Sequence, residues 1–186
     1  MNPHHTNPSP RNVRRLLTAS LLAPALLAPL ALAATAPTGT VRVAAPGLPF
    51  AVNLPRGWVG VDFKDGLKGV SIASQAKAPA ALMRFTFIPK QGKTLVLKNE
   101  FLGFEQAVKQ GGTTIRLVSE KSVRYGGVNG LSHVYDLAQQ GKKLRMQIWF
   151  GSGVKNFYNF QLTDQAATYS KNATLFGAAL KSVKFD

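Results

Sequence analysis

The spacing of apolar residues changes period twice along the chain, and these changes predict the order of its elements. Short apolar runs punctuated by glycine and proline are typical of strands. The ranges predicted as strands before the first helix are 41–45, 50–54, 58–63, 69–74 and 81–88. We interpret Pro55-Arg56-Gly57 and Asp65-Gly66 as turns, because proline presets φ and glycine tolerates positive φ.

A helix is predicted in the middle of the chain, where four apolar residues recur at spacings that place them on one helical face. They are Leu97, Phe101, Phe104 and Val108. Gly111-Gly112 then supplies a glycine stop.

The second half of the chain predicts a meander of strands and a closing helix. The strand ranges are 113–124, 131–138, 142–150 and 154–162. Asn129-Gly130 indicates a hairpin turn, and Asp164 is a suitable N-cap for the last helix. The helix residues expected in the core are Tyr169, Phe176 and Leu180, and the range 181–186 predicts a short final strand or a packed tail.

Strands, a helix, a meander and a second helix together indicate an α+β fold, an antiparallel β-sheet flanked by helices. No internal repeat is visible. We therefore expect a single domain over residues 41–186, a length that builds its own core.

The first 33 residues are typical of a secretory signal peptide. Arg11, Arg14 and Arg15 precede an apolar run over 16–32, and Ala31-Leu32-Ala33 has the small-x-small pattern of a cleavage site. The alternative is a transmembrane anchor. The apolar run is short for a span of about 20 residues, and two internal prolines interrupt it. We expect cleavage, a flexible tail over 34–40 and an extracytoplasmic protein, periplasmic or secreted.

The composition is strongly basic and lacks cysteine. The chain has 23 Lys+Arg, three of them in the leader, so 20 remain against 8 Asp+Glu. Such a charge attracts polyanions such as nucleic acid, anionic lipid or acidic wall polymer, although it also serves solubility. The absence of cysteine excludes disulfides and thiolate metal sites.

Three segments resemble the PsbP-like superfamily, which includes the extrinsic PsbP subunit of the oxygen-evolving complex and exported bacterial relatives such as DcrB. The first is the run from Phe50 to Trp58 with its Pro-x-Gly-Trp opening. The others are 123–136 and the closing helix with its terminal strand. The resemblance implies an αβα sandwich around an antiparallel sheet, and binding or assembly roles more often than catalysis. It carries over no catalytic residue.

The residues that usually carry chemistry do not converge in the sequence. His133 is the one histidine after the leader. On a strand it shares a face with Leu131 and Tyr135, while Ser132 and Asp136 lie on the other face, so the three cannot form a triad. Asp62 and Asp65 lack the spacing of a calcium loop, and we interpret them as turn caps. We predict no catalytic residue, cofactor or metal.

One basic and aromatic surface is a candidate for binding. Lys143, Arg145 and Trp149 share a face of the strand over 142–150, and we expect Phe157 on the next strand to join Trp149. Arg116 and Arg124 either extend this basic surface or belong to an ordinary solvated sheet face. The alternative is that a helix covers this face and both aromatic residues belong to the core.

These observations predict an exported, non-enzymatic binding or accessory protein, expected to be a monomer, that contacts a protein or envelope partner through its surface. A polyanion binder acting through the basic surface is the first alternative. A hydrolase that gathers carboxylates from distant strands is the second.

Overall fold

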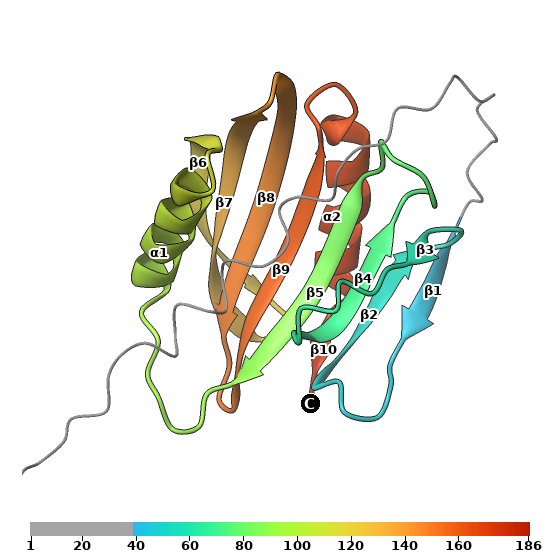
Figure 1. Cartoon of the computed structure of the whole chain (residues 1–186). Coiled ribbons are helices and arrows are strands. Elements are labelled where there is room, and N and C mark those ends of the chain that lie inside the picture. Colours follow the sequence, from blue (N-terminus) through green and yellow to red (C-terminus); the bar gives the residue numbers. More distant parts are fainter. Residues whose placement is uncertain (1–38) are drawn as a thin grey trace, which may run out of the picture.

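The computed structural model describes residues 39–186, which form ten strands and two helices (Figure 1). In chain order the elements are β1 Thr40–Val43, β2 Phe50–Pro55, β3 Val59–Gly60, β4 Lys68–Ala73, β5 Leu82–Pro89, α1 Leu97–Gln110, β6 Thr114–Tyr125, β7 Val128–Gln139, β8 Lys142–Ser152, β9 Asn156–Gln165, α2 Tyr169–Ser182 and β10 Lys184–Phe185. The predicted leader and most of the predicted tail lie outside the described residues, and Thr40 belongs to β1.

Two antiparallel sheets organise these strands. The larger sheet has the order β3-β4-β5-β9-β8-β7-β6, and the smaller has the order β1-β2-β10. Strand β9 pairs with β5 on one side and β8 on the other, so it joins the early strands to the later meander in one sheet. The predicted α+β fold is confirmed.

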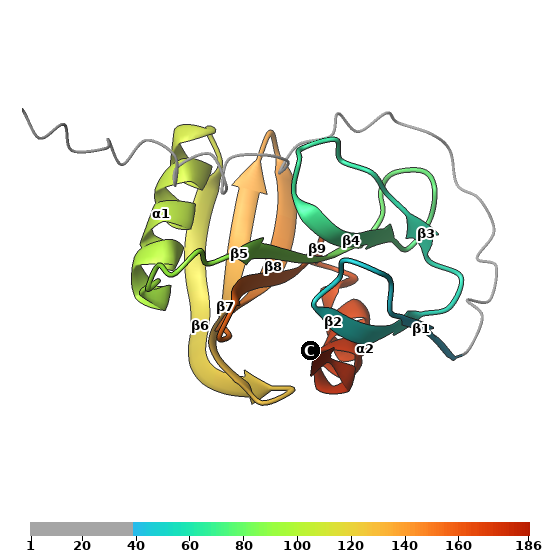
Figure 2. The same cartoon turned by 90° about the horizontal axis from the view of Figure 1, so that it is seen from below.

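Different elements cover the two faces of the larger sheet. Helix α1 lies on one face, over β6, β7 and β8, while α2 and the smaller sheet lie on the opposite face (Figure 2). We call these the α1 face and the α2 face. The α1 face buries Phe101, Phe104, Val108, Leu131, Tyr135, Leu137, Met146, Ile148, Phe150 and Phe157. The α2 face buries a second apolar cluster that includes Phe50, Phe85, Trp149, Phe160, Phe176 and Leu180.

Trp149 is the largest fully buried side chain and occupies a space made by two glycines. A Cβ atom on Gly130 of β7 or on Gly151 of β8 would overlap the indole ring. The indole Nε1–H donates a 3.1 Å hydrogen bond to the carbonyl oxygen of Val123 on β6. Both apolar burial and this hydrogen bond therefore depend on the absence of side chains at residues 130 and 151.

Most predicted elements are confirmed, but three local predictions are wrong. Asn129 and Gly130 lie inside β7, and the turn is made by Gly126 and Gly127, both with positive φ. The strand predicted over 58–63 shrinks to the two residues of β3.

Asp164 is the penultimate residue of β9 and is not the N-cap of α2, which begins at Tyr169 after Thr168. Its carboxylate accepts hydrogen bonds from the Gln165 backbone N–H, the Thr168 hydroxyl and the Asn172 amide. Asp164 thus organises the turn before the helix.

Strand β6 is the edge of the larger sheet and pairs only with β7 among the described residues. A β-bulge between Leu117 and Ser119 interrupts its register, and most of its side chains are exposed. No helix within residues 39–186 is long and apolar enough to cross a membrane.

The space around Trp149 generates a stability prediction. Gly130→Ala or Gly151→Ala should each lower the free energy of unfolding by about 1–3 kcal/mol, because each adds a methyl group to a filled core. Gly177→Ala in α2 is the control, since a Cβ there meets no atom within 4 Å and alanine favours helix. Urea denaturation measures all three, and equal stability of the three variants would contradict the packing argument.

Candidate functional site

The six residues of the predicted basic and aromatic surface lie on both faces of the larger sheet. Lys143, Arg145, Trp149 and Arg116 are on the α2 face, while Phe157 belongs to the core of the α1 face. By register Arg124 also lies on the α1 face, because its partner Asn129 shares a face with Leu131.

Trp149 and Phe157 do not form a shared aromatic surface. Trp149 is 0% exposed and Phe157 is 3% exposed, so both are core residues. Trp149 pairs with Phe160 in the β8–β9 register, which turns Phe157 to the other face. The prediction that they lie together is wrong, and the alternative that both belong to the core is correct.

Two of the predicted cations, Arg116 and Arg145, lie in one row across the α2 face with an acid between them. Arg116 on β6, Asp136 on β7 and Arg145 on β8 are direct cross-strand partners. Arg145 Nε donates a 2.7 Å hydrogen bond to Asp136 Oδ1, and Arg116 Nη2 donates to Asp136 Oδ2. We call Arg116 and Arg145, joined through Asp136, the arginine pair.

The two arginines of the pair are held in place by the ionised Asp136 carboxylate and by an aromatic ring of α2. Hydrogen bonding from Arg145, with a further contribution from Arg116, lowers the pKa of Asp136 below its usual range. The Arg145 guanidinium also lies 5.7 Å from the ring centroid of Tyr169 on α2, within reach of a cation–π interaction. The pair is therefore held from β7 and from α2, while the Arg116 side chain stays 72% exposed.

Arg124 has a local structural contact. Its Nε donates a 2.8 Å hydrogen bond to the carbonyl oxygen of Gly127. This bond spans the two-glycine turn between β6 and β7, so Arg124 is separated from the arginine pair by most of the hairpin.

His133 lies in a polar network beneath α1. Its ring stacks on Phe101 of α1, with centroids 3.6 Å apart and planes 9° apart. Nδ1 lies 2.7 Å from the Tyr135 hydroxyl, which donates a 2.9 Å hydrogen bond to Glu105 of α1. Nε2 lies 3.0 Å from a Glu120 carboxylate oxygen, although the geometry is not that of a hydrogen bond.

Burial shifts the pKa values of His133 and Tyr135 so that both side chains stay neutral at neutral pH. Desolvation lowers the pKa of His133 despite the opposing effects of Glu120 and Glu105. Desolvation also raises the pKa of Tyr135, and its hydrogen bond to Glu105 adds to that rise. His133 is thus neutral and packed at neutral pH, as expected for a sheet histidine. Ser132 and Asp136 lie on the opposite face, as predicted.

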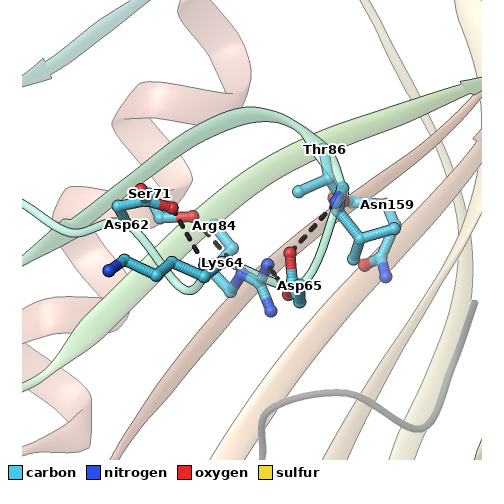
Figure 3. A network of polar contacts seen from close by, with 8 residues as sticks. Asp62, Lys64, Asp65, Ser71, Arg84, Thr86 and Asn159 are labelled. Carbon is cyan, nitrogen blue, oxygen red and sulfur yellow. Dashed lines mark hydrogen bonds and ion pairs between the residues drawn. The ribbon is translucent and has the colours of Figure 1, made fainter.

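A second polar network lies on the α1 face over β4 and β5 (Figure 3). Arg84 forms a 2.6 Å ion pair with Asp65, and the side chains are only 4% and 7% exposed. Arg84 Nε also donates to the Ser71 hydroxyl, and the guanidinium lies 4.3 Å from the Phe63 ring centroid. The ion pair therefore fastens the loop between β3 and β4 onto the sheet.

The turn-cap interpretation of Asp62 and Asp65 is confirmed. Asp62 accepts a hydrogen bond from the Lys64 backbone N–H, and Asp65 accepts one from that of Leu67. Sequence reasoning missed the Asp65–Arg84 pair and the Glu105–Tyr135 bond. The one available signal was Arg84 itself, a charge at an inward position of an apolar strand. Within residues 39–186 no three His, Cys, Asp or Glu side chains gather as a metal-binding set.

The His133 network predicts a pH dependence of stability. The unfolded chain should take up a proton at the ordinary histidine pKa, near 6.5, while the folded chain resists protonation. The free energy of unfolding should thus fall as the pH drops from about 7 to about 5. His133→Gln should flatten this slope, as measured by urea denaturation across that range. An unchanged slope in the variant would contradict the assignment.

The Arg84 network predicts a large cost for removing one partner. Asp65→Asn should lower the free energy of unfolding by about 3–5 kcal/mol, because it leaves a buried guanidinium without its counter-charge. Asp62→Asn is the matched control at an exposed acid of the same loop, and its cost should stay below about 1 kcal/mol. Equal costs in thermal or urea unfolding would show that the pair contributes little.

No protein-family model matches the chain, and no curated protein matches it in sequence. Solved structures do match. The solution structure of cyanobacterial PsbP (CyanoP) from Synechocystis sp. PCC 6803 aligns with a TM-score of 0.62 at 14% identity, covering 86% of this chain and 100% of that one.

Two other bacterial structures align over 78% of this chain. LpqN, involved in cell envelope biogenesis of Mycobacterium tuberculosis, gives a TM-score of 0.56 at 9% identity and is covered to 90%. PA94 from Pseudomonas aeruginosa, a protein of unknown function, gives 0.51 at 11% identity and is covered to 96%. At these identities the likeness concerns architecture, and the chain has a PsbP-like fold.

Proposed function

We propose that the protein is an exported, non-enzymatic accessory protein that binds a partner in the cell envelope through its surface. The observation that carries the proposal is the unbalanced charge on the exterior. Within residues 39–186 the ion pairs between charged side chains all use arginine, and no lysine takes part in one. A surface with so many uncompensated ammonium groups favours association with an acidic partner.

The distribution of the polar side chains supports a binding role over catalysis. His133 is packed against Phe101, Asp65 is paired with Arg84, and Asp164 orders the turn before α2. These groups, which could otherwise serve as acids or bases, each have a structural partner. Surface contact then accounts for the chain more simply than chemistry on a substrate.

The proposed location rests on two independent observations. The first 33 residues have the charge, apolar run and cleavage pattern of a secretory leader. LpqN, which shares the fold, is involved in cell envelope biogenesis. An envelope partner is consistent with both.

The second candidate function is polyanion binding, favoured by the same charge surplus. The two candidates differ in their response to salt. A protein interface with an apolar centre survives moderate ionic strength, whereas contacts to a polyanion weaken steeply as counterions compete.

Capture of envelope components tests the proposal. The chain is produced with its own leader and a C-terminal affinity tag, and an envelope extract is passed over it at about 50 mM and about 200 mM salt. We expect a protein component to be retained at both concentrations. The control replaces Lys93, Lys155 and Lys184 by glutamine, which reduces the charge at exposed positions away from the arginine pair.

The outcomes separate the two candidates. Retention of a protein component that survives moderate salt supports a protein partner, and the substituted variant measures how much of that retention depends on charge at Lys93, Lys155 and Lys184. Retention of acidic polymer that disappears at moderate salt supports the second candidate instead. No retention at either concentration contradicts both.

A further inference from the structure

The arginine pair has unused hydrogen-bonding capacity. Three of its nitrogens contact Asp136: Nε and Nη2 of Arg145 and Nη2 of Arg116. Each guanidinium carries five N–H donors, so one carboxylate satisfies only a minority of them. Nη1 of both arginines and Nε of Arg116 have no partner among the described residues.

Asp136 positions these donors without neutralising them. One carboxylate faces two guanidiniums, and the low pKa of Asp136 keeps it ionised over the physiological range. Asp164 lies across from Arg145 on β9. Its buried carboxylate is turned to the β9–α2 turn, from which it accepts hydrogen bonds, and among residues 39–186 it forms no ion pair with either arginine. The pair therefore retains a net positive charge with a defined geometry.

Lys143 adds a third cation beside the pair. It lies two residues before Arg145 on β8 and on the same face, which corresponds to roughly 7 Å along the strand. Its backbone is fixed because its carbonyl oxygen accepts a hydrogen bond from the Ala166 N–H. Its cross-strand partner is Ala138, whose own partner on β6 is Thr114.

Ala138 leaves room for an anion between these groups. Thr114, Ala138 and Lys143 form a second row across the three strands, next to the arginine pair. All three residues are exposed, and alanine has the smallest side chain of the three. An anion above Ala138 would meet Lys143 on one side and the Thr114 hydroxyl on the other. Along the strands it would meet the row in which two guanidiniums flank the single carboxylate of Asp136. Three cations and a hydroxyl would use all of the about four lone-pair sites of a single carboxylate, whereas a phosphate group has more oxygens and more charge to distribute among them.

We propose that Arg116, Arg145 and Lys143 form a binding site for the phosphate groups of an anionic polymer. The inference rests on the second candidate function and names its site. A polymer fits better than a free ion, because exposed contacts are individually weak and gain strength by repetition along a chain. A lipid surface fits less well. The exposed large apolar side chains of the three strands are Leu117, which lies on the α1 face, and Val118 in the bulge of β6, too few for insertion into a bilayer.

Binding of short-chain polyphosphate to the full-length protein tests the site. Titrations compare wild type with Lys143→Gln and with Arg116→Gln, both exposed and outside the core. Each substitution should weaken binding about tenfold, the loss of one charge-assisted hydrogen bond. Lys155→Gln and Arg56→Gln are matched controls that remove the same charges from exposed turns elsewhere, and their affinities should stay within about twofold.

Three results would overturn the site. The first is an equal loss in all four variants, which would mean that binding follows total charge. The second is the absence of polyphosphate binding at about 50 mM salt. The third is equal or tighter binding, through the same residues, to polyglutamate or to vesicles containing phosphatidylglycerol. If the site fails while envelope capture succeeds, the protein-partner proposal stands alone.

Discussion

Strand β8 buries apolar side chains on both of its faces, and the arrangement of the whole molecule follows from that constraint. Met146, Ile148 and Phe150 need a cover on one side, which α1 provides, while Trp149 needs one on the other. Because β8 is an interior strand that pairs with β7 and β9, its two-sided burial fixes the register of both neighbours and hence which side chains reach the surface. The arginine pair lies on the same strand face as Trp149, at the end where the helical cover of α2 begins.

The sequence predicted well those features that depend on local periodicity. The α1 stripe and the alternation of β8 both appear in the structure because each is a repeat of a few residues with one buried side. Phe157 shows where prediction from local periodicity stops. Its face depends on how many residues the turn between β8 and β9 contains, and a shift by one residue moves the whole strand to the other face. The hairpin turn predicted at Asn129-Gly130 was wrong for a related reason. Gly126-Gly127 forms the turn, and residue 130 is a glycine because a side chain there would overlap the Trp149 ring.

The contacts between distant residues could not be predicted from one sequence. Asp65 and Arg84 come from a loop and a neighbouring strand, and Glu105 reaches Tyr135 from a helix. Nothing in local spacing specifies such pairs, because they arise when two elements pack. Lys143 and Arg145 lie on one face of β8, as the alternation predicts. Asp136, which joins Arg145 to Arg116, entered the sequence analysis only as a failed triad member.

The bulged edge strand β6 also bears on behaviour at high concentration. An unpaired edge of this length exposes backbone donors and acceptors that would template the addition of another chain. The bulge at Leu117–Ser119 breaks the spacing that such a ladder requires, and Arg116, Lys121 and Arg124 repel an identical edge. The cations of β6 thus oppose sheet-to-sheet polymerisation, and one of them, Arg116, also belongs to the proposed phosphate site.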